Sequence, residues 1–359
     1  MRAPIRVGII GASATGGWAR ESHVPAVTAL AGLELAAIGS SSQSSADAAA
    51  EEFGAPVAYG DTADLFADPS IDLVTVATPV PAHRDLLLRA VRAGKHVLSE
   101  WPVGGDTQQT REIAEEADRA GVHAVVGLQA RANPAFVLAR RMLADGAVGR
   151  VLSMSVLSTT AGFGPRVPEA SLYLEDPASG MNLATIQAAH TLDAAVGLVG
   201  ELEFLSATFT TQFPDLTVGD PPRSEHRRTA DHVSLSARLA GGAVLTAEVA
   251  GGRPGDDTPF RLEVVCTDGT LSLVGGAPRG FQSGTLVLEV DGRAQQPPVG
   301  ETDGLPEPVV NVAGVYAAAR DDILAGTSTA PSFEHALHLS RIVDSVFESA
   351  RDGRRVILP

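Results

Sequence analysis

Short apolar runs alternate with amphipathic helical stretches along the first third of the chain. The runs are rich in Val, Ile and Leu, which is typical of strands buried on both faces of a sheet. The predicted strands are Ile5–Ile10, Leu33–Gly39, Leu73–Ala77, His96–Ser99 and Ala124–Leu128, and the predicted helices are Asp47–Phe53, His83–Ala93 and Thr107–Ala120. This alternation predicts right-handed crossovers and a doubly wound parallel sheet of the α/β class.

The pattern changes after about Gln129, because strands then follow one another without helices between them. Two helices, Pro134–Ala144 and Met181–Leu198, flank a predicted strand at Arg150–Thr159. The later strands are separated by glycine turns that are typical of hairpins. They are predicted at Leu202–Thr211, Val233–Leu239, Val244–Ala250, Phe260–Cys266, Leu271–Val274 and Thr285–Val290.

Two polar stretches, Pro214–Thr229 and Gln295–Pro308, are predicted as long surface loops, and a helix with one apolar face closes the chain. These patterns predict an N-terminal dinucleotide-binding domain over residues 1–128. They also predict an α+β domain with a mostly antiparallel sheet over residues 129–359.

Composition excludes several classes of function. The chain has 359 residues, of which 44% are hydrophobic, so it can form two packed cores. A net charge of −16 and only 4% aromatic residues argue against nucleic-acid binding. Cys266 is the only cysteine, so neither a disulfide framework nor a cysteine zinc site is expected, and we predict no metal. Without a signal-peptide pattern or a membrane-length apolar run, we expect a cytoplasmic protein that does not bind membranes.

A glycine-rich segment follows the first predicted strand and opens a helix. Gly11 is predicted to form the tight turn, and Gly16 is predicted to let the helix and the strand pack closely. Ser13 replaces the middle glycine of the usual fingerprint. Backbone N–H groups at Ser13, Ala14 and Thr15 would then supply an anion site for a pyrophosphate. The alternative is a glycine-rich turn that binds no nucleotide.

The residues after the second strand discriminate between the two nicotinamide dinucleotides. An acidic residue there binds the ribose 2′-hydroxyl of NAD and repels a 2′-phosphate. In this chain Ser40, Ser41 and Ser42 are neutral, and no carboxylate comes before Asp47. The sequence therefore predicts a preference for NADP(H) over NAD(H). The alternative is a solvated serine turn that only caps the next helix.

Three motifs resemble a known family of enzymes. They are Thr-Pro-Val-Pro-Ala-His at 78–83, Ala-Gly-Lys-His-Val at 93–97 and Glu-Trp-Pro at 100–102. Together they closely resemble the glucose–fructose oxidoreductase/inositol dehydrogenase/MocA family, and the resemblance covers nearly the whole chain. It implies an N-terminal Rossmann domain, a second domain with a large open-faced sheet, and an active site between them.

The resemblance also assigns roles to individual residues. It places Thr78, Pro79 and His83 along the path of the bound dinucleotide, and it places Glu100 and Trp101 near the nicotinamide ring. We interpret Glu100 either as a residue that orients the nicotinamide amide or as a simple strand end. Trp101 either stacks on the nicotinamide or on a sugar, or it fills space.

The departures from the family pattern matter as much as the matches. The family usually carries a Lys at the position of Trp101 and an Asp at the position of Ile186, whereas His190 matches the family His. Similar replacements occur in a subgroup similar to the fungal galactose-pathway repressor, an NADP-binding protein that regulates by binding another protein. The segments 128–131, 179–193 and 231–232 resemble that subgroup.

His190 is the first candidate for general acid/base catalysis, because imidazole titrates near neutral pH. The alternative is a buried histidine that hydrogen-bonds Asp193 or a backbone carbonyl. Tyr173 is a second candidate proton donor, although a tyrosine there more often packs or caps a loop. The spacing of His335 and His338 suggests a metal, but we interpret the pair as a solvated helix face because no third ligand is evident.

Further residues are predicted to contact the substrate, and each has a structural alternative. Arg131 and Asn133 open the second domain, and Arg131 equally suits a structural salt bridge. Gln187 lies on the helix of His190. His232 begins a strand that lines the substrate cleft in relatives, and its alternative is a surface turn. With Trp101 and His190, these residues complete the predicted substrate site.

Two hypotheses follow. The first is an oxidoreductase that transfers a hydride between NADP(H) and a sugar, a glycoside, or a small ketone or imine. The second is a non-catalytic NADP-binding regulatory protein. Consecutive residues of a strand point to opposite faces of the sheet, and Val264 and Val265 are both apolar. The open face therefore carries apolar side chains too, which predicts a homodimer or tetramer formed through it.

Overall fold

The computed structural model describes residues 3–358, which divide into two compact units. The first unit comprises the chain up to Gln129 together with Glu301–Ser340, and the second comprises Ala130–Gly300 and the chain from Arg341 onward. The predicted boundary after residue 128 assigned residues 301–340 to the second domain. They pack in the first unit because the apolar helix α8 (Val309–Ala325) lies against α1 (Val24–Ala29).

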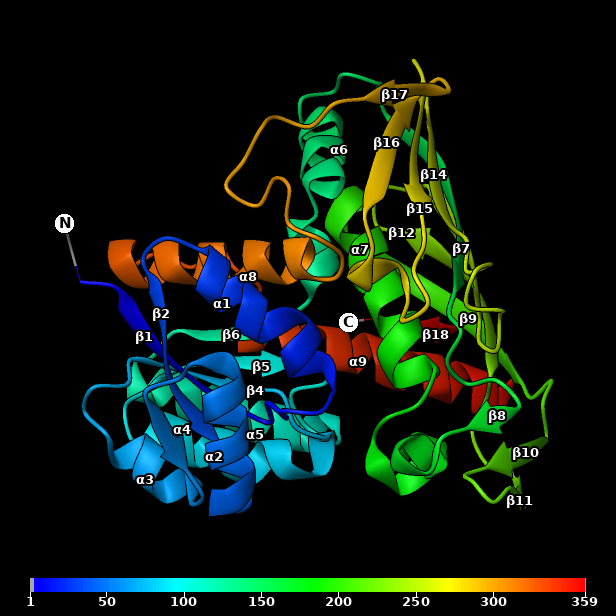
Figure 1. The fold of residues 1–359 in the computed structure, drawn as a ribbon. Coiled ribbons are helices and arrows are strands. Elements are labelled where there is room, and N and C mark those ends of the chain that lie inside the picture. Colours follow the sequence, from blue (N-terminus) through cyan, green and yellow to red (C-terminus); the bar gives the residue numbers. More distant parts are fainter. Residues whose placement is uncertain (1–2, 359) are drawn as a thin grey trace. The chain divides into compact units, whose positions relative to one another are not determined.

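The first unit is built on a parallel six-stranded sheet in the order β3-β2-β1-β4-β5-β6. Its strands are β1 (Ile5–Ile10), β2 (Leu33–Gly39), β3 (Val57–Tyr59), β4 (Leu73–Val76), β5 (His96–Glu100) and β6 (Ala124–Gly127). Its other helices include α2 (Gln43–Phe53), α3 (Thr62–Ala67), α4 (His83–Arg92) and α5 (Thr107–Ala120). In Figure 1, helices α1 and α8 lie over one face of this sheet, and α4 and α5 lie over the other. The predicted doubly wound α/β fold is confirmed.

Local sequence signals set the ends of these helices. The Asp106 carboxylate accepts a hydrogen bond from the Gln109 N–H (2.7 Å) at the start of α5, and Gly121 ends that helix in the left-handed region at φ +66°. The short elements β3 and α3 were not predicted from the sequence, because neither is long enough to show a clear periodicity.

The second unit carries a nine-stranded sheet in the order β17-β16-β15-β14-β7-β13-β12-β9-β18, in which only the β13–β7 pair is parallel. The strands are β7 (Val151–Thr159), β9 (Leu202–Thr210), β12 (His232–Leu239), β13 (Val244–Ala250), β14 (Phe260–Cys266), β15 (Thr270–Gly275), β16 (Leu286–Val290), β17 (Arg293–Gln295) and β18 (Val356–Ile357). The predicted mostly antiparallel sheet is therefore confirmed. Asp291 and Gly292 both have positive φ (49° and 73°), as a two-residue hairpin turn between β16 and β17 requires.

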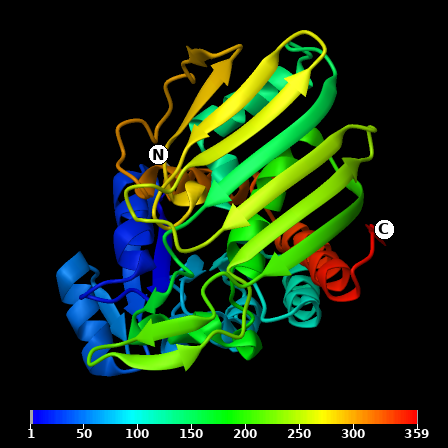
Figure 2. The same cartoon turned by 90° about the vertical axis from the view of Figure 1, so that its right-hand side faces the viewer.

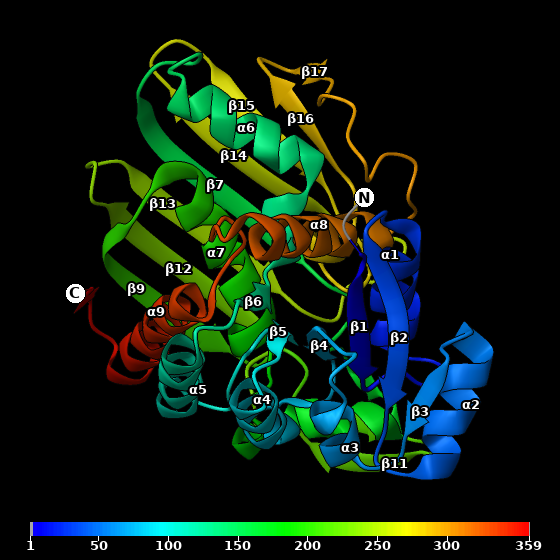
Figure 3. The same ribbon diagram turned by 90° about the vertical axis from the view of Figure 1, so that its left-hand side faces the viewer.

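The two faces of the large sheet differ. Helices α6 (Pro134–Ala144) and α7 (Ala189–Val199) pack on one face, where Leu183 and Ala188 meet Val233 and Val249 in a buried cluster (Figure 3). Figure 2 shows the opposite face, and no helix lies in front of it. The large sheet is thus covered by helices on one side only.

The prediction of a long surface loop at Pro214–Thr229 is wrong. The segment forms strands β10 (Asp215–Val218) and β11 (Arg223–His226), which join β8 (Arg166–Val167) in a small three-stranded sheet. Arg227, which directly follows β11, has a fully buried side chain. The guanidinium donates to the carboxylate of Glu175 (2.8 and 2.9 Å), 52 positions away, and to that of Asp231 (2.8 Å), four positions on, so both carboxylates neutralise its buried charge.

Helix α9 (Phe333–Asp352) closes the chain and contains the predicted apolar face. Among the described residues, no helix combines the length and the apolar character needed to cross a bilayer.

Candidate functional site

The glycine-rich loop of the first unit lies against the end of β4. Gly11 has φ +101°, and a Cβ there would lie 2.6 Å from the Ala77 carbonyl oxygen and 3.1 Å from Thr78 Cγ2. The predicted tight turn at Gly11 is therefore confirmed. The predicted packing role of Gly16 is wrong, because a Cβ at Gly16 would meet no atom within 4 Å. Gly16 instead faces open space, where a ligand can approach the backbone.

The loop is braced by its own side chains. The Ser13 hydroxyl accepts a hydrogen bond from the Thr15 N–H (3.3 Å) and lies 3.2 Å from the Thr15 hydroxyl. Arg20 donates to the Ala14 carbonyl (2.5 Å). These contacts fix the conformation of the loop, and the first helical turn after it begins at Ala19.

Three buried polar atoms in the first unit have no hydrogen-bond partner among the described residues: Trp18 Nε1, Thr78 Oγ1 and Gln129 Oε1. Trp18 follows the glycine loop after β1, Thr78 follows β4, and Gln129 follows β6. All three therefore lie beyond the carboxyl ends of parallel strands, where ligands bind in open α/β sheets. Buried polar atoms without partners are rare and costly, so a ligand with hydrogen-bonding groups is the simplest explanation.

The serines after β2 have mainly structural contacts. The Ser40 N–H donates to the Tyr59 carbonyl (3.0 Å), and the Ser42 hydroxyl caps α2 by accepting from the Ser45 N–H (3.3 Å). Ser42 therefore caps the next helix, as the alternative interpretation of this serine turn predicted. Ser41 is exposed, and the first carboxylate, Asp47, accepts from Gln43 (2.8 Å). The residues that directly follow β2, Ser40–Ser45, include no carboxylate.

His83 joins the Thr78-Pro79 segment to the turn after β5. Its Nε2 lies 2.7 Å from the Thr78 carbonyl oxygen and its Nδ1 lies 2.9 Å from that of Pro102, and the ring is buried. Burial lowers the pKa of His83, against hydrogen bonds to the backbone that raise it. A neutral imidazole carries a single N–H, so His83 donates one of these two hydrogen bonds, while its other nitrogen lies against a carbonyl oxygen without donating. The ring packs between these two loops.

Glu100 ends β5, and its carboxylate is held by a residue that sequence reasoning did not single out. His23 Nε2 lies 2.9 Å from Glu100 Oε1, and His23 Nδ1 lies 3.0 Å from the hydroxyl of Tyr316 on α8. The Glu100 side chain is 17% exposed, and Trp101 beside it is 5% exposed. In the sequence, His23 is visible only as a histidine seven positions after Gly16, because its partners Glu100 and Tyr316 lie far away in the chain.

In the second unit, His190 follows a π-helical turn, Ala184–Ala188, that leads into α7. The Ala188 N–H bonds the Leu183 carbonyl (3.0 Å), as the wider π turn requires. Such turns often occur at functional sites because they re-aim the side chains around them. His190 is 4% exposed, and Ile186, at the usual Asp position, lies one turn before it.

Gln187 is anchored within the second unit. Its amide pairs reciprocally with the amide of Gln282 (3.2 and 3.3 Å) and lies 3.5 Å from the Ser158 hydroxyl on β7. Gln187 is 1% exposed, so its amide is fixed against the sheet. In the sequence it precedes His190 by three positions.

Arg131 and Asn133 also have structural contacts. Arg131 Nε donates to both carboxylate oxygens of Asp193 (2.8 and 2.9 Å), and its Nη2 donates to the Asp193 carbonyl (3.3 Å). This is the structural salt bridge that the sequence left as the alternative. The Asn133 side chain caps α6 by accepting from the Ala135 N–H (3.0 Å) and the Phe136 N–H (3.4 Å).

Tyr173 and His232 belong to elements other than the helix of His190: Tyr173 lies in the 3-10 turn Glu169–Glu175 and His232 in β12. Tyr173 lines a hollow of about 330 Å³ with Leu172, Asp176, Leu216, His226 and Arg228 among its walls. Burial raises the pKa of Tyr173, which makes its hydroxyl a poor acid near neutral pH. His232 begins β12, and its Nε2 lies 3.2 Å from Glu248 Oε1. Its neighbours Val233 and Val249 face the helices, so His232 points to the opposite, helix-free side of the sheet.

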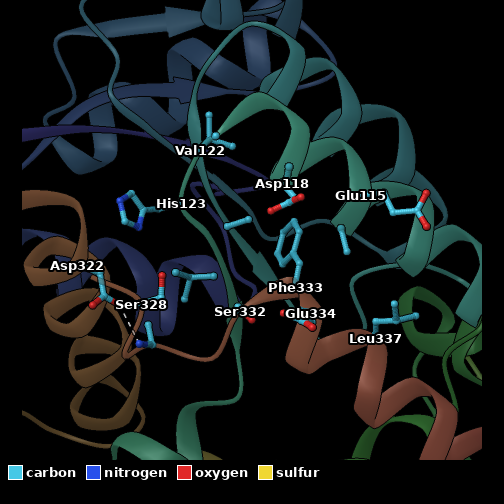
Figure 4. A pocket seen from close by; sticks show the side chains of 16 residues that line it. Glu115, Asp118, Val122, His123, Asp322, Ser328, Ser332, Phe333, Glu334 and Leu337 are labelled. Atoms are coloured by element: carbon cyan, nitrogen blue, oxygen red, sulfur yellow. Dashed lines mark hydrogen bonds between the residues drawn. The ribbon is translucent and has the colours of Figure 1, made fainter. Parts of the chain in front are cut away.

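A further hollow of about 600 Å³ lies beside the start of β6 (Figure 4). Asp118, His123, Asp322 and Phe333 are among the side chains around it. It lies at the amino-terminal end of β6, away from the strand ends where the glycine loop lies, so it is not the dinucleotide site. The described residues contain no group of three or more His, Cys, Asp or Glu side chains that could hold a metal ion.

Comparison with known proteins matches two stretches of the chain to family models. Residues 5–128 match the model of the oxidoreductase family with an NAD-binding Rossmann fold, and residues 134–275 match that of the Gal80p C-terminal domain. The relative dehydrogenase aclE of Aspergillus oryzae is 33% identical over 221 residues, which are 58% of this chain and 59% of that protein. The chain thus spans about six tenths of the length of that relative.

Two further proteins resemble the chain over most of its length. The galactose/lactose metabolism regulatory protein GAL80 of Saccharomyces cerevisiae is 25% identical over 317 residues, which are 81% of this chain and 71% of that protein. A levoglucosan dehydrogenase solved in complex with NADH has a TM-score of 0.85 at 24% identity, with 99% of each chain covered. At this identity the structural match establishes the fold alone.

Proposed function

We propose that the chain is an oxidoreductase that transfers a hydride between NADP(H) and a small substrate, because residues 5–128 match the model of the oxidoreductase family with an NAD-binding Rossmann fold. The substrate class that we propose is a sugar, a glycoside, or a small ketone or imine. The observation that carries the proposal is the set of partnerless buried atoms at Trp18, Thr78 and Gln129, beyond the strand ends and around an open glycine loop.

The residues present fit a nicotinamide dinucleotide. Its pyrophosphate would be held by the N–H groups of Ser13 and Ala14, close to the open space at Gly16, and the Thr15 N–H would exchange its contact with the Ser13 hydroxyl for a phosphate oxygen. Thr78 and Pro79 would line its path, and Glu100 and Trp101 would meet its nicotinamide end. The neutral turn at Ser40–Ser42 removes the carboxylate that repels a 2′-phosphate, which supports NADP(H) over NAD(H).

The bound dinucleotide supplies hydride chemistry, and the chain must hold the substrate and exchange one proton. We propose that His190 takes the proton of the substrate hydroxyl as hydride leaves the carbon, and returns it in the reducing direction. Gln187 would fix the substrate from the same helix segment. Tyr173 is a weaker candidate because its raised pKa disfavours ionisation.

Calorimetry with NADPH and NADH tests the cofactor proposal. We expect NADPH to bind more tightly, and tighter binding of NADH would contradict the preference.

Turnover of NADPH with a panel of ketoses, glycosides and cyclic imines tests the proposed enzyme activity. Loss of turnover in His190→Ala with retained NADPH binding is the expected result. Failure of every substrate in both directions, with NADPH still bound, would remove the enzyme proposal.

A second candidate function is a cofactor-sensing regulator without catalysis. It is favoured by Trp101 and Ile186, which replace two proton-handling groups, and by the Gal80p-type second domain. This function requires a partner protein whose affinity for the chain changes when NADPH is added. A pull-down that is insensitive to NADPH would count against it.

We also propose that two copies of the chain associate through the helix-free face of the large sheet. That face carries exposed apolar side chains, Leu157, Val244 and Val287, among serines and threonines. These exposed apolar side chains on the helix-free face are the observation that supports the association.

A further inference from the structure

A continuous line of hydrogen bonds crosses the interior of the first unit. It runs from the Thr75 hydroxyl to the Tyr316 hydroxyl (2.7 Å), from Tyr316 to His23 Nδ1 (3.0 Å), and from His23 Nε2 to Glu100 Oε1 (2.9 Å). Thr75, Tyr316 and His23 each have no exposed surface. Only Glu100, at one end, reaches the surface.

Donor and acceptor counting gives this line one direction. A carboxylate only accepts, so His23 Nε2 must donate to Glu100. With Nε2–H present in the neutral ring, Nδ1 accepts the Tyr316 O–H, and Tyr316 in turn accepts the Thr75 O–H. In this direction His23 and Tyr316 each use both a donor and an acceptor, so loss of His23 leaves the buried Tyr316 O–H without an acceptor, and loss of Glu100 leaves the buried His23 N–H without one.

The two ends of the His23 contact belong to different parts of the proposed dinucleotide site. His23 is the last residue of the π-helical turn Ala19–His23, which begins directly after the glycine loop and Trp18. Glu100 ends β5 and is followed by Trp101. A Cβ on Gly127 would lie 2.7 Å from Glu100 Oε1, so the Glu100 carboxylate packs against the backbone of β6 and has little freedom to move.

The turn that carries His23 is also tied to the loop. The Ser22 hydroxyl donates to the Trp18 carbonyl (2.7 Å), and Arg20 donates to the Ala14 carbonyl (2.5 Å). The Trp18 indole N–H is buried and has no acceptor within residues 3–358, so a ligand that accepts its hydrogen bond acts on the same turn. A change at the loop therefore reaches His23 through one short helical segment.

We propose that His23 is a positioning residue that couples occupation of the phosphate loop to the placement of Glu100 and Trp101. The proposal rests on the proposed function, because it requires a dinucleotide phosphate at the loop. It applies to an enzyme, whose nicotinamide end would be set by the coupling, and equally to a regulator, whose surface at Trp101 would report the bound ligand. Coupling of this kind requires the His23–Glu100 contact to differ between the empty and the occupied loop, and this difference is what the proposal predicts.

The test uses the full chain labelled with 5-fluorotryptophan. The chain has two tryptophans, so two ¹⁹F resonances are expected, and Trp18→Phe assigns them. The probe is 2′-phospho-ADP-ribose, which carries the pyrophosphate but no nicotinamide and therefore does not reach Trp101 directly. Binding of the probe is followed by calorimetry, and the Trp101 resonance is followed in the same samples.

In the unsubstituted chain, the probe is expected to shift the Trp101 resonance. In His23→Phe and in Tyr316→Phe, the shift is expected to fall at least about twofold while the probe still binds. His23→Gln, which keeps an N–H donor, is expected to restore part of it. Tyr59→Phe is the matched control, because the Tyr59 hydroxyl donates to Asp68 (2.7 Å) outside the line, and it should respond like the unsubstituted chain.

Two outcomes overturn the proposal in distinguishable ways. If the probe binds but the Trp101 resonance moves equally in all variants, or does not move at all, the coupling is wrong and the dinucleotide site stands. If neither the probe nor NADPH binds the unsubstituted chain, the proposed function fails and the coupling fails with it. Tyr316→Phe removes a single oxygen, so it keeps the test decisive should His23→Phe not fold.

Discussion

His23 Nε2 and Glu100 Oε1 lie 2.9 Å apart although 77 positions separate the two residues in the chain. The contact brings the turn after the first strand to the end of the fifth strand. Parallel strands in a doubly wound sheet end at the same edge, so residues that follow different strands become neighbours there. The His23 side chain, from the helical turn after the glycine loop, therefore holds the end of β5 that Trp101 follows.

Replacing Glu100 with Ala should destabilise the first unit. The substitution leaves the His23 N–H buried without an acceptor, which costs about 1–3 kcal/mol. Urea unfolding measures the change. The matched control is Glu112→Ala, because Glu112 pairs with Arg84 on the surface (2.6 Å) and its loss should change the unfolding midpoint little. Equal effects of the two substitutions would argue that the His23–Glu100 contact contributes nothing.

Replacing Asp193 with Ala should destabilise the second unit more strongly. Asp193 is 1% exposed and is the carboxylate partner of the Arg131 guanidinium. Breaking a buried pair by removing one partner costs about 3–5 kcal/mol, because the other charge stays buried. Thermal unfolding measures the loss. Asp145→Ala, which removes an exposed partner of Arg141, serves as the control and should leave the melting temperature nearly unchanged.

Stability should fall as the pH is lowered below about 6.5, in part because of His83. Burial is the largest cause of its lowered pKa, so the folded chain keeps the ring neutral while the unfolded chain takes up a proton below the ordinary value of 6.5. The stabilisation is therefore present above pH 6.5 and is lost as the pH falls toward the folded pKa. One such proton contributes a slope of at most about 1.4 kcal/mol per pH unit.

Denaturant unfolding at a series of pH values checks the slope. His83→Gln should flatten it, whereas His226→Gln, at an exposed ring, should not. His96 has a pKa lowered mainly by burial and shifts stability in the same direction, so part of the slope should remain in His83→Gln. An unchanged slope in His83→Gln would contradict the assignment.

The sequence predicted most strands well because burial on both faces leaves continuous apolar runs. Ile5–Ile10, Leu33–Gly39, Val244–Ala250 and Phe260–Cys266 were placed with their observed bounds. The helix Val309–Ala325 was not predicted. Its residues are apolar around most of the helix, so no amphipathic period marks it, and only its packing in the first unit explains the composition.

The candidate site was predictable only where local sequence fixes the backbone. The turn at Gly11 follows from its place after a strand, and its positive φ agrees with that prediction. The roles of His23 and Arg227 could not be predicted, because their partners Glu100 and Glu175 come from distant segments. A lone histidine or arginine in a polar stretch has no local signal that distinguishes a buried, paired group from a solvated one.

Gly11 and Gly16 should respond differently to alanine. Gly11→Ala forces a side chain into φ +101° with its Cβ 2.6 Å from the Ala77 oxygen, so we expect a loss of about 2 kcal/mol or more. Gly16→Ala adds a methyl that meets no atom within 4 Å, so the fold should keep its stability. Because that open space is where the phosphates are proposed to bind, Gly16→Ala should weaken NADPH binding about tenfold. Unchanged calorimetric affinity would argue that the dinucleotide binds elsewhere.

The helix-free face of the large sheet should make the chain dimeric or tetrameric. Leu157 on β7 and Val287 on β16 are 36% and 50% exposed there, and each would be covered by a second copy of the same face. Leu157→Glu places a charge in that contact, so light scattering should report a smaller assembly, while circular dichroism should be unchanged because the side chain points away from the core. Val137→Glu is the control, since Val137 is similarly exposed at 41% but lies on α6, outside this face. A monomeric mass for the unsubstituted chain would contradict the proposed association. The exposed apolar side chains of this face would then lie in water in the isolated chain.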